Sequence, residues 1–375
     1  MTSEHLSRIG VVGTGFLARH FVLALEMYRD LAASKVLTRT NIWKRTDFPR
    51  QDLLTNSVEE LLDNSDLVVE CSGDAVYATE VIAKTMKASL PVVTMDSELQ
   101  VTTGSYFARR GFITEAEGDQ SGSLASLREN AIQMGFKPLV YGNIKRFLNH
   151  SPTKGEMEFW AAKQNYSLEM TTSFTDGTKL QIEQALVANG LGTGIAQPGL
   201  LGIASEDVES GAQILAEESK KLGYPISDYV LSSKAPAGVF IVAEHDQQHK
   251  MSLSNYKMGE GPYYLFLRPY HICHFETPYA IRRAVKNRDP ILVQKKRVLE
   301  VGSRAKKDLK PGTKLDGIGG FHLYGVLETP SSLPIGLSEG TILRKSKKRD
   351  EPITWDDVEF EEDDLGLKLW KEQSD

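Results

Sequence analysis

A short apolar stretch that ends in a glycine-rich turn constrains the fold of this chain more than any other feature. Residues 8–12 read Arg-Ile-Gly-Val-Val, and Gly13-Thr14-Gly15-Phe16-Leu17-Ala18 follows at once. Apolar residues then recur at spacings of three and four, which predicts a helix over 16–30. A strand, a G-x-G-x-x-A turn and a helix in this order are typical of a dinucleotide-binding unit. The alternative is a tight turn with a purely structural role.

The small residues of this turn each meet a requirement of cofactor binding. Gly13 permits the tight turn, Gly15 lets the backbone approach a pyrophosphate, and Ala18 lets the helix pack closely on the strand. The N–H groups at the start of the helix attract phosphate, so we expect Phe16 and Leu17 to border the cofactor too.

A second apolar run, 66–70, continues into Cys71-Ser72-Gly73 and reads as a buried central strand. Cofactors of this fold bind at the carboxyl ends of the strands. We therefore expect Cys71, Ser72 and Gly73 to contact the cofactor, with Cys71 as a small core residue and not a nucleophile.

The end of the next predicted strand, residues 35–39, bears on the choice of cofactor. An Asp or Glu there would hold the ribose 2′-hydroxyl of NAD, but the strand ends in Arg39. Lys44 and Arg45 follow shortly after. An arginine at this point suits a 2′-phosphate, so the sequence favours NADP(H); the alternative is that Arg39 is a solvated strand end.

Composition sets broad limits on the class of protein. The 375 residues suggest two or three domains, and 41% hydrophobic with 25% charged residues is typical of a globular protein. A net charge of −6 gives no general attraction for nucleic acid. We expect no membrane association, because no apolar run approaches ~20 residues. Two distant cysteines and the absence of signal-peptide features favour the cytoplasm.

Strand and helix patterns alternate through the first part of the chain. Strands are predicted at 66–73, 90–96, 112–114 and 139–143, with a helix over about 76–88. This alternation predicts an α/β fold with a doubly wound parallel sheet of the Rossmann type over residues 1–145.

The pattern changes after residue 145. Residues 146–295 mix a helix near 154–166, a strand at 168–175, a helix at 181–189 and strands at 239–243 and 263–267, so we expect an α+β catalytic and dimerisation domain. A smaller region follows at 296–360. The charged runs near the end predict solvated faces and a loose tail over 361–375.

Several stretches spread over most of the chain match one known family of oxidoreductases. They are Gly118-Asp119, Lys145 with Asn149, 174–179, Glu183, 188–189, 228–229, Lys234, 236–240, 261–263, 268–271, 305–312 and 353–358. On these residues the chain resembles the 1-deoxyxylulose-5-phosphate reductoisomerase-like proteins, which join a homoserine-dehydrogenase-like NAD(P)-binding domain to a C-terminal SAF (β-clip) domain. The resemblance implies that 296–360 is the SAF domain and that the protein is a dimer.

Two lysines are candidates for the proton donor that carbonyl reduction needs. Lys145 follows a predicted strand and Lys234 lies in a segment with Pro and Gly; both match lysines of the family, and a surface role is the alternative for each. Asp119 opens a helix, where it would orient a lysine or substrate hydroxyl, or else cap the helix. Glu183 lies among apolar residues of a helix and therefore needs a partner.

The segment 268–274 combines polar and aromatic residues. Arg268 suits a bidentate contact with phosphate or carboxylate, and His271 titrates near neutrality. In the alternative, Arg268 pairs with a carboxylate in a structural loop. His271 and His274 are spaced like metal ligands, but no further ligand lies nearby in sequence, so we expect no metal.

Together these features predict an NAD(P)H-dependent oxidoreductase that acts on a small, phosphorylated or otherwise anionic, sugar-like hydroxy or keto compound. One alternative is the isomerisation and reduction that the resemblance implies. Another is a non-catalytic nucleotide-sensing protein.

Overall fold

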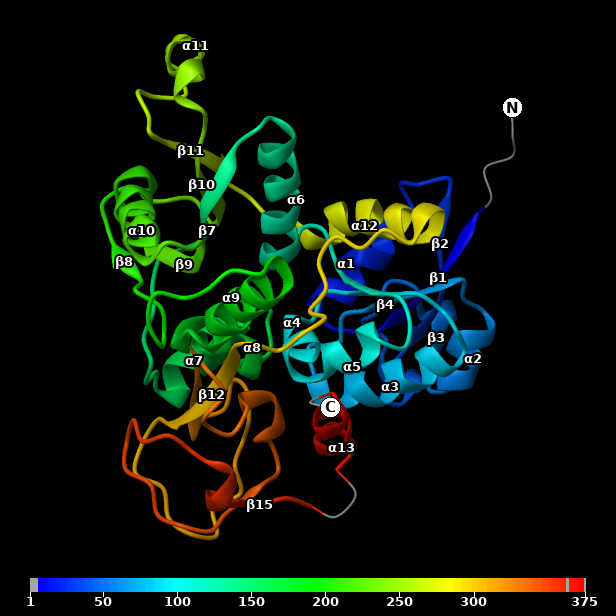
Figure 1. The fold of residues 1–375 in the computed structure, drawn as a ribbon. Coiled ribbons are helices and arrows are strands. Elements are labelled where there is room, and N and C mark those ends of the chain that lie inside the picture. Colours follow the sequence, from blue (N-terminus) through cyan, green and yellow to red (C-terminus); the bar gives the residue numbers. More distant parts are fainter. Residues whose placement is uncertain (1–5, 362–363, 374–375) are drawn as a thin grey trace.

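The computed structural model describes residues 6–361 and 364–373 (Figure 1). Parts of two expectations, the N-terminal residues 1–5 and segments of the predicted tail, lie outside the described residues.

The first domain contains a six-stranded parallel sheet, as the alternating pattern predicted. Its strand order is β3-β2-β1-β4-β5-β6. Chain order reverses direction between β1 and β4, which places the carboxyl ends of these two strands at the switch point where dinucleotides bind. The strands are β1 (Ser7–Val12), β2 (Leu31–Leu37), β3 (Leu54–Thr55), β4 (Leu67–Glu70), β5 (Val92–Thr94) and β6 (Ile113–Glu115).

Helices cover both faces of this sheet. On one face, α1 (Phe16–Leu25) packs beside α12 (Cys273–Asn287), which returns from a distant part of the chain. On the other face lie α2 (Val58–Asp63), α3 (Ala75–Lys87) and α5 (Ser105–Ala108). A short α4 (Ser97–Leu99) and a π-helical turn, Gln100–Gly104, connect β5 to α5.

The second strand differs from its predicted position. It begins at Leu31 and ends at Leu37, so Thr38 and Arg39 lie beyond its carboxyl end. Leu31, Ala32 and Ala33 also pair with β1. Alanine has little preference for strands, so the sequence pattern placed the start of this strand too late.

The second domain contains a five-stranded mixed sheet in the order β11-β10-β7-β9-β8. The prediction that residues 139–143 belong to the Rossmann sheet is wrong: they lie in β7, which pairs with β9 and β10. The local pattern identified a strand but carried no information on its partners. The strands are β7 (Lys137–Lys145), β8 (Ile203–Ala204), β9 (Ile226–Leu231), β10 (Gly238–Glu244) and β11 (Tyr263–Arg268).

Helices sandwich this sheet too. α6 (Gln120–Gln133) and α9 (Thr178–Leu191) pack on one face and α10 (Val208–Leu222) on the other. α9 extends beyond the predicted helix at 181–189 and includes Gly190, where the side chain of Leu292 occupies the space that a Cβ would need. α7 (Lys154–Gln164) precedes α9, and α11 (Lys250–Asn255) projects from the far end of the domain (Figure 1).

The strand predicted at 168–175 is wrong, because these residues form α8 (Leu168–Asp176). Ser167 caps the helix by accepting a hydrogen bond from the Met170 N–H, and the hydroxyls of Thr171 and Thr172 bond back to carbonyls one turn earlier. Threonine suits strands by propensity, but these local bonds and burial against the domain outweigh that preference.

The C-terminal region is a small β structure. β12 (Glu300–Ala305) pairs antiparallel with β13 (Leu323–Glu328), and β14 (Ile342–Leu343) pairs with β15 (Val358–Glu359). Its core includes Ile182 and Ala185 of α9, so this region and the second domain share one hydrophobic cluster.

The prediction of a loose tail is wrong for residues 365–372, which form α13 (Leu365–Glu372). This helix packs on α3 and α5 of the first domain (Figure 1). Leu369 is buried in the core of that domain, and the Gln373 amide donates to the Thr102 carbonyl at 2.7 Å. Apolar residues between the charged ones form a stripe along one side of the helix, which makes it amphipathic. The prediction of a tail considered only the charged residues and overlooked this stripe.

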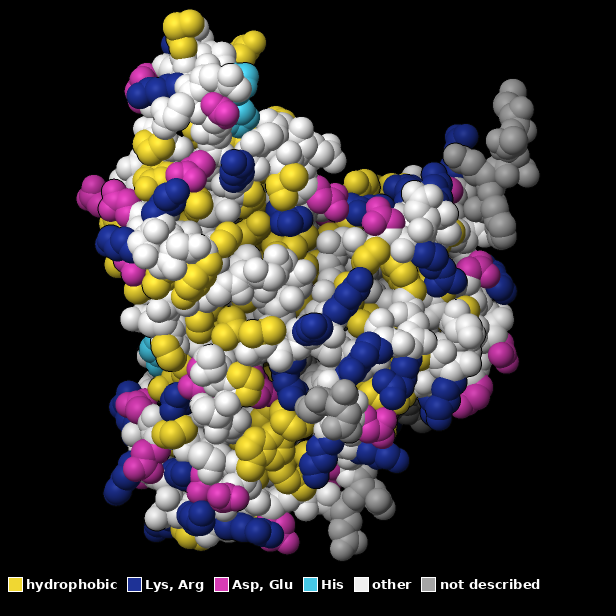
Figure 2. All heavy atoms as spheres, in the orientation of Figure 1, with side chains coloured by type: hydrophobic (Ala, Val, Ile, Leu, Met, Phe, Trp, Pro, Cys, Tyr) yellow, Lys and Arg dark blue, Asp and Glu magenta, His cyan; other side chains and the backbone are white. Residues whose placement is uncertain are grey.

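None of the described helices combines the length and the apolar character that crossing a bilayer requires. On the face drawn in Figure 2, Lys and Arg side chains are spread around α5 and α13, and hydrophobic side chains gather over the C-terminal region beside them.

Candidate functional site

The glycine turn has the shape that a pyrophosphate requires. Gly13 has a φ of +111°, and a Cβ there would lie 2.9 Å from the Cys71 carbonyl oxygen. A Cβ on Gly15 would meet no atom within 4 Å, so the backbone is open to a ligand on that side. Gly15 is also the N-cap of α1 and provides no side-chain cap, which leaves the first N–H groups of the helix for phosphate. These features fit a dinucleotide.

Phe16 and Leu17, both predicted to border the cofactor, are half-buried at the start of α1. The Phe16 ring lies edge-on to Tyr166, with centroids 5.1 Å apart, and tilted against His20 at 4.3 Å. Tyr166 precedes α8, so the second domain reaches the first turn of α1.

The residues after β4 lie beside the same turn. Cys71 is buried and its thiol donates to the Val12 carbonyl at 3.3 Å; burial raises its thiol pKa, which agrees with a core role. Ser72 is fixed by the buried carboxylate of Glu70, which accepts from its hydroxyl at 2.6 Å. Gly73 has a φ of +69° and open space at its Cβ position.

Arg39 extends from β2 towards α3. Its Nη2 lies 2.7 Å from Asp74 Oδ2, and its guanidinium lies 4.4 Å from the centroid of the Tyr77 ring. The side chain is 62% exposed, so it remains accessible to a ligand. Arg45 approaches the turn as well, since its Nη2 donates to the Thr14 carbonyl at 2.5 Å.

Asp119 is the N-cap residue of α6, yet its side chain makes no capping bond. Instead the Ser97 hydroxyl lies 2.9 Å from Asp119 Oδ2 and 2.8 Å from Glu115 Oε1. Burial and the neighbouring Asp119 charge raise the pKa of Glu115. Burial alone would raise the pKa of Asp119. The positive charge of Lys179 and the hydrogen bond with Glu115 have the larger effect, so the pKa of Asp119 is lowered. One of this carboxyl pair is therefore ionised.

Lys145 and Glu183, predicted from separate parts of the sequence, come together. Lys145 Nζ lies 3.6 Å from Glu183 Oε2, and the Gln120 amide lies beside this pair. Asn143 Nδ2 donates to the same Glu183 oxygen at 2.9 Å. Burial raises the pKa of Glu183, against the opposing effect of the two lysine charges. The buried glutamate thus finds the partner that its position in a helix requires.

Sequence reasoning missed Lys179 and Glu98 as site residues. Lys179 lies in the first turn of α9, is buried, and forms an ion pair of 2.7 Å with Glu98 Oε2. Burial alone would lower its pKa, but Glu98, Asp119 and Glu183 together raise it well above the ordinary value. The signal for Glu98 was its place just after β5, where strand ends face a cofactor.

His271 Nε2 lies 3.3 Å from Gln120 Nε2, which places the imidazole at the edge of this cluster. Burial lowers its pKa, despite the opposing charge of Asp119, so the ring is neutral at pH 7. Within residues 6–361 and 364–373, no three His, Cys, Asp or Glu side chains are grouped to hold a metal ion. We refer below to the polar cluster, whose members are Glu98, Glu115, Asp119, Gln120, Asn143, Lys145, Lys179, Glu183 and His271.

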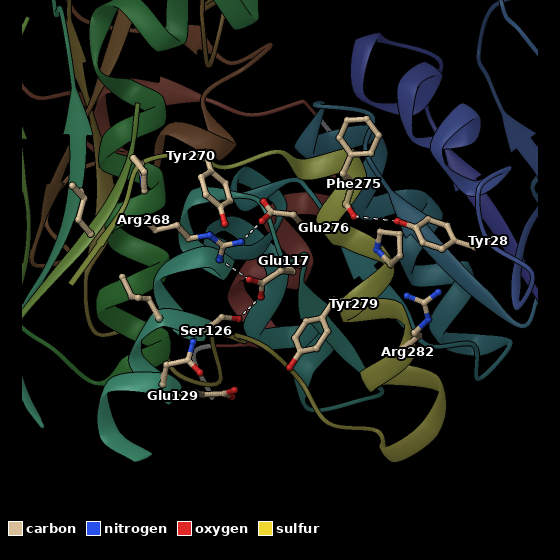
Figure 3. Close-up of a pocket in the computed structure, with 15 residues that line it drawn as sticks. Tyr28, Glu117, Ser126, Glu129, Arg268, Tyr270, Phe275, Glu276, Tyr279 and Arg282 are labelled. Atoms are coloured by element: carbon tan, nitrogen blue, oxygen red, sulfur yellow. Dashed lines mark hydrogen bonds and ion pairs between the residues drawn. The ribbon is translucent and has the colours of Figure 1, made fainter. Parts of the chain in front are cut away.

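Arg268 lies apart from the polar cluster, in a pocket of about 560 Å³ between α6, β11 and α12 (Figure 3). Its Nη1 donates to Glu117 Oε1 at 2.6 Å, and its Nη2 pairs with Glu276. Figure 3 shows both carboxylates pointing at the guanidinium, with the Tyr270 ring beside it. Two carboxylates therefore neutralise the charge of Arg268. This arrangement agrees with the alternative given above, in which Arg268 pairs with a carboxylate in a structural loop.

Lys234 is exposed in the loop between β9 and β10. In the described structure its ammonium has no contact with the polar cluster. Of the two candidate lysines, the structure brings only Lys145 into the cluster.

Residues 118–277 match the model of a family described as oxidoreductase DRL, catalytic domain. The match begins next to Asp119 and includes Lys145, Lys179, Glu183 and His271. No curated protein matches the sequence.

Among solved structures, a "probable dehydrogenase" from Thermotoga maritima is 13% identical, with 77% of this chain and 91% of that chain covered and a TM-score of 0.44. UDP-N-acetylglucosamine 3-dehydrogenase from Acidithiobacillus ferrooxidans is 12% identical, with coverages of 77% and 92% and a TM-score of 0.43. Scyllo-inositol dehydrogenase from Lactobacillus casei is 11% identical, with coverages of 64% and 73% and a TM-score of 0.38. At these scores the likenesses carry no inference about activity.

The catalytic-domain match covers the polar cluster except Glu98 and Glu115, and it does not reach the glycine turn, which follows β1 of the Rossmann sheet. With that turn and that sheet, the match makes the chain an NAD(P)-dependent oxidoreductase.

Proposed function

We propose that this oxidoreductase uses NADP(H) and transfers a hydride to or from a small, sugar-like hydroxy or keto compound. The observation that carries the proposal is the polar cluster. Glu98 and Asp119 follow β5 and β6, and Lys145 ends β7, so the cluster adjoins the sheet edge at which a nicotinamide binds.

The choice of NADP(H) rests on the end of β2. No carboxylate follows the strand directly, and Thr38 and Arg39 stand where a ribose is held in this fold. Arg39 is exposed enough to exchange Asp74 for a 2′-phosphate, and Arg45 contributes a second positive charge beside the turn. The cofactor supplies the hydride chemistry, while the residues of this chain bind and position it.

Lys145 is the proton donor in this proposal. Its ammonium pairs with Glu183 but is not fully enclosed, with 15% of the side chain exposed. It can therefore give a proton to a substrate oxygen as the carbonyl is reduced, or return it in the reverse direction. His271 is neutral and so is suited to accept a substrate hydroxyl hydrogen bond.

The charges of the polar cluster favour a substrate rich in hydroxyl groups. Its carboxylates outnumber its two lysines, and both lysines already face a glutamate. Hydroxyl groups can donate hydrogen bonds to such carboxylates. The anion-holding role that we expected of Arg268 finds no support in its geometry, because Glu117 and Glu276 neutralise it.

The test follows NADPH absorbance with a panel of sugar ketones and polyols that includes 1-deoxyxylulose 5-phosphate. For any substrate turned over, Lys145→Met should lower kcat by about 10²–10⁴-fold, and Lys234→Met should leave it unchanged. An equal loss in both variants, or none in Lys145→Met, would contradict this assignment. Cofactor binding without turnover across a broad panel would favour the nucleotide-sensing alternative.

We also propose, from the family resemblance, that the C-terminal region is a SAF module and that the protein forms a homodimer through its second domain. Light scattering coupled to size-exclusion chromatography tests the dimer; a single species of monomer mass at all concentrations would exclude it.

A further inference from the structure

A second cavity, of about 380 Å³, lies where the second domain meets the C-terminal region. It shares no lining residue with the polar cluster or with the pocket around Arg268. Its volume falls in the range of small-molecule sites. The lining residues are Ser151 and Pro152 from the loop before α7, Lys154 at the start of α7, and Lys306, Lys307 and Phe321 from the C-terminal region.

Lys306 fixes one wall of this cavity. It is buried, its ammonium lies 2.6 Å from Asp176 Oδ2, and it also donates to the Gly320 carbonyl. A lysine ammonium has three N–H donors, and these are its two acceptors among the described residues, so one donor remains. The ammonium also lies 5.8 Å from the centroid of the Phe321 ring, which places the charge and the aromatic face together.

The other polar side chains that line the cavity can still form hydrogen bonds or ion pairs with a ligand. Lys307 is exposed and has no ion pair within the described part of the chain. Lys154 is 66% exposed and makes one long ion pair, 3.7 Å, with Glu158. The Ser151 hydroxyl oxygen accepts from Arg349 Nη2 at 3.1 Å, which leaves its hydrogen free to donate.

We propose that this cavity is a binding site for a small phosphate ester, distinct from the cofactor and substrate sites. The three lysines and the Ser151 hydroxyl contact the phosphate, because the lining contains ammonium groups and no carboxylate. The Phe321 ring packs against the organic part of the ligand, for which the cavity has room beside a phosphate group.

The experiment uses isothermal titration of the full chain without cofactor, at about 0.15 M salt to screen weak surface attraction. The probes are inorganic phosphate and phenyl phosphate. Phenyl phosphate should bind more tightly than inorganic phosphate, because only the ester reaches Phe321. Lys307→Ala should weaken phenyl phosphate binding about tenfold, the loss expected for one strong charge-assisted contact. Lys306 is left intact, because its removal would strand the buried Asp176.

Two further variants make the result specific. Lys310→Ala removes an exposed lysine of the same region that does not line the cavity, and Arg39→Ala disables the proposed 2′-phosphate contact. Neither should change phenyl phosphate binding. Absence of binding, an equal loss in Lys310→Ala, or a loss confined to Arg39→Ala would each overturn the proposal, and none of these outcomes bears on the oxidoreductase activity.

Discussion

Arg39 and Asp74 offer a sharp test of the cofactor choice, because two substitutions should move NADPH affinity in opposite directions. Arg39→Ala removes the proposed partner of the 2′-phosphate. Asp74→Asn removes the carboxylate that now holds Arg39 at 2.7 Å. Asp74 also caps α3 by accepting from the Tyr77 N–H at 3.0 Å, and asparagine preserves that cap. The second substitution therefore changes charge without loosening the helix.

The magnitudes follow from exposure and distance. A hydrogen bond to a charged group contributes about 1.5–3 kcal/mol, and the 62% exposure of Arg39 reduces this to about 1–1.5 kcal/mol. Arg39→Ala should thus weaken NADPH about five- to tenfold. A phosphate that takes the place of Asp74 beside Arg39 would lie within about 4–5 Å of that carboxylate, which costs about 1 kcal/mol in water. Asp74→Asn should tighten NADPH about fivefold.

The assay is a titration of NADPH and NADH against each variant by fluorescence or calorimetry. The ratio of the two dissociation constants isolates the 2′-phosphate, since the cofactors are otherwise identical. Arg50→Ala, at an exposed arginine paired with Asp52, is the matched control and should leave the ratio unchanged. If the ratio is the same in wild type, Arg39→Ala and Asp74→Asn, the NADP(H) proposal is wrong.

Three more substitutions test the structure directly. Gly13→Ala should abolish measurable NADPH binding in a titration, because its φ of +111° and the contact with Cys71 both exclude a Cβ; wild-type affinity would contradict this. Lys306→Met should lower the free energy of unfolding by about 3–5 kcal/mol in urea, since it leaves the buried Asp176 carboxylate alone; the double variant with Asp176→Leu should recover most of it. Burial raises the pKa of Glu300 to about 7, so its stabilising effect is complete below the unfolded pKa of about 4.5 and is lost as pH rises through 7. Thermal unfolding of Glu300→Gln should lack that decline, and a parallel decline in both proteins would refute the assignment.

The first domain was predictable because its signals are local. Apolar strands of the parallel sheet, the glycine spacing and the helix after it are all read from neighbouring residues. The sheet to which β7 belongs was not predictable in this way, since β7 pairs with β9 and β10 from more than 70 residues later. α8 was not predicted, because threonine occurs in both strands and helices. The Ser167 cap and the hydrogen bonds from the threonine hydroxyls to backbone carbonyls favour the helix.

In the candidate site, too, single residues could be predicted from local sequence, whereas contacts between distant residues could not. Lys145, Glu183 and Asp119 were predicted one by one, from strand ends and from a charge among apolar residues. Their mutual contacts, and the Lys179–Glu98 pair, join residues far apart in the chain, so no local pattern contains them. Arg268 shows the limit of residue type as a guide: a guanidinium suits an anion, but only the fold reveals that two carboxylates already surround it.

The return of the chain at α13 has a mechanical consequence. At one end of the C-terminal region, Gln294 bonds to Asn189 of α9 and to Ser105 of α5; at the other, α13 is embedded in the first domain. The C-terminal region shares a hydrophobic core with α9, so it moves with the second domain as one unit. The packing of α13 ties that unit to the first domain at a second place, and cutting the chain between β15 and α13 would remove this tie.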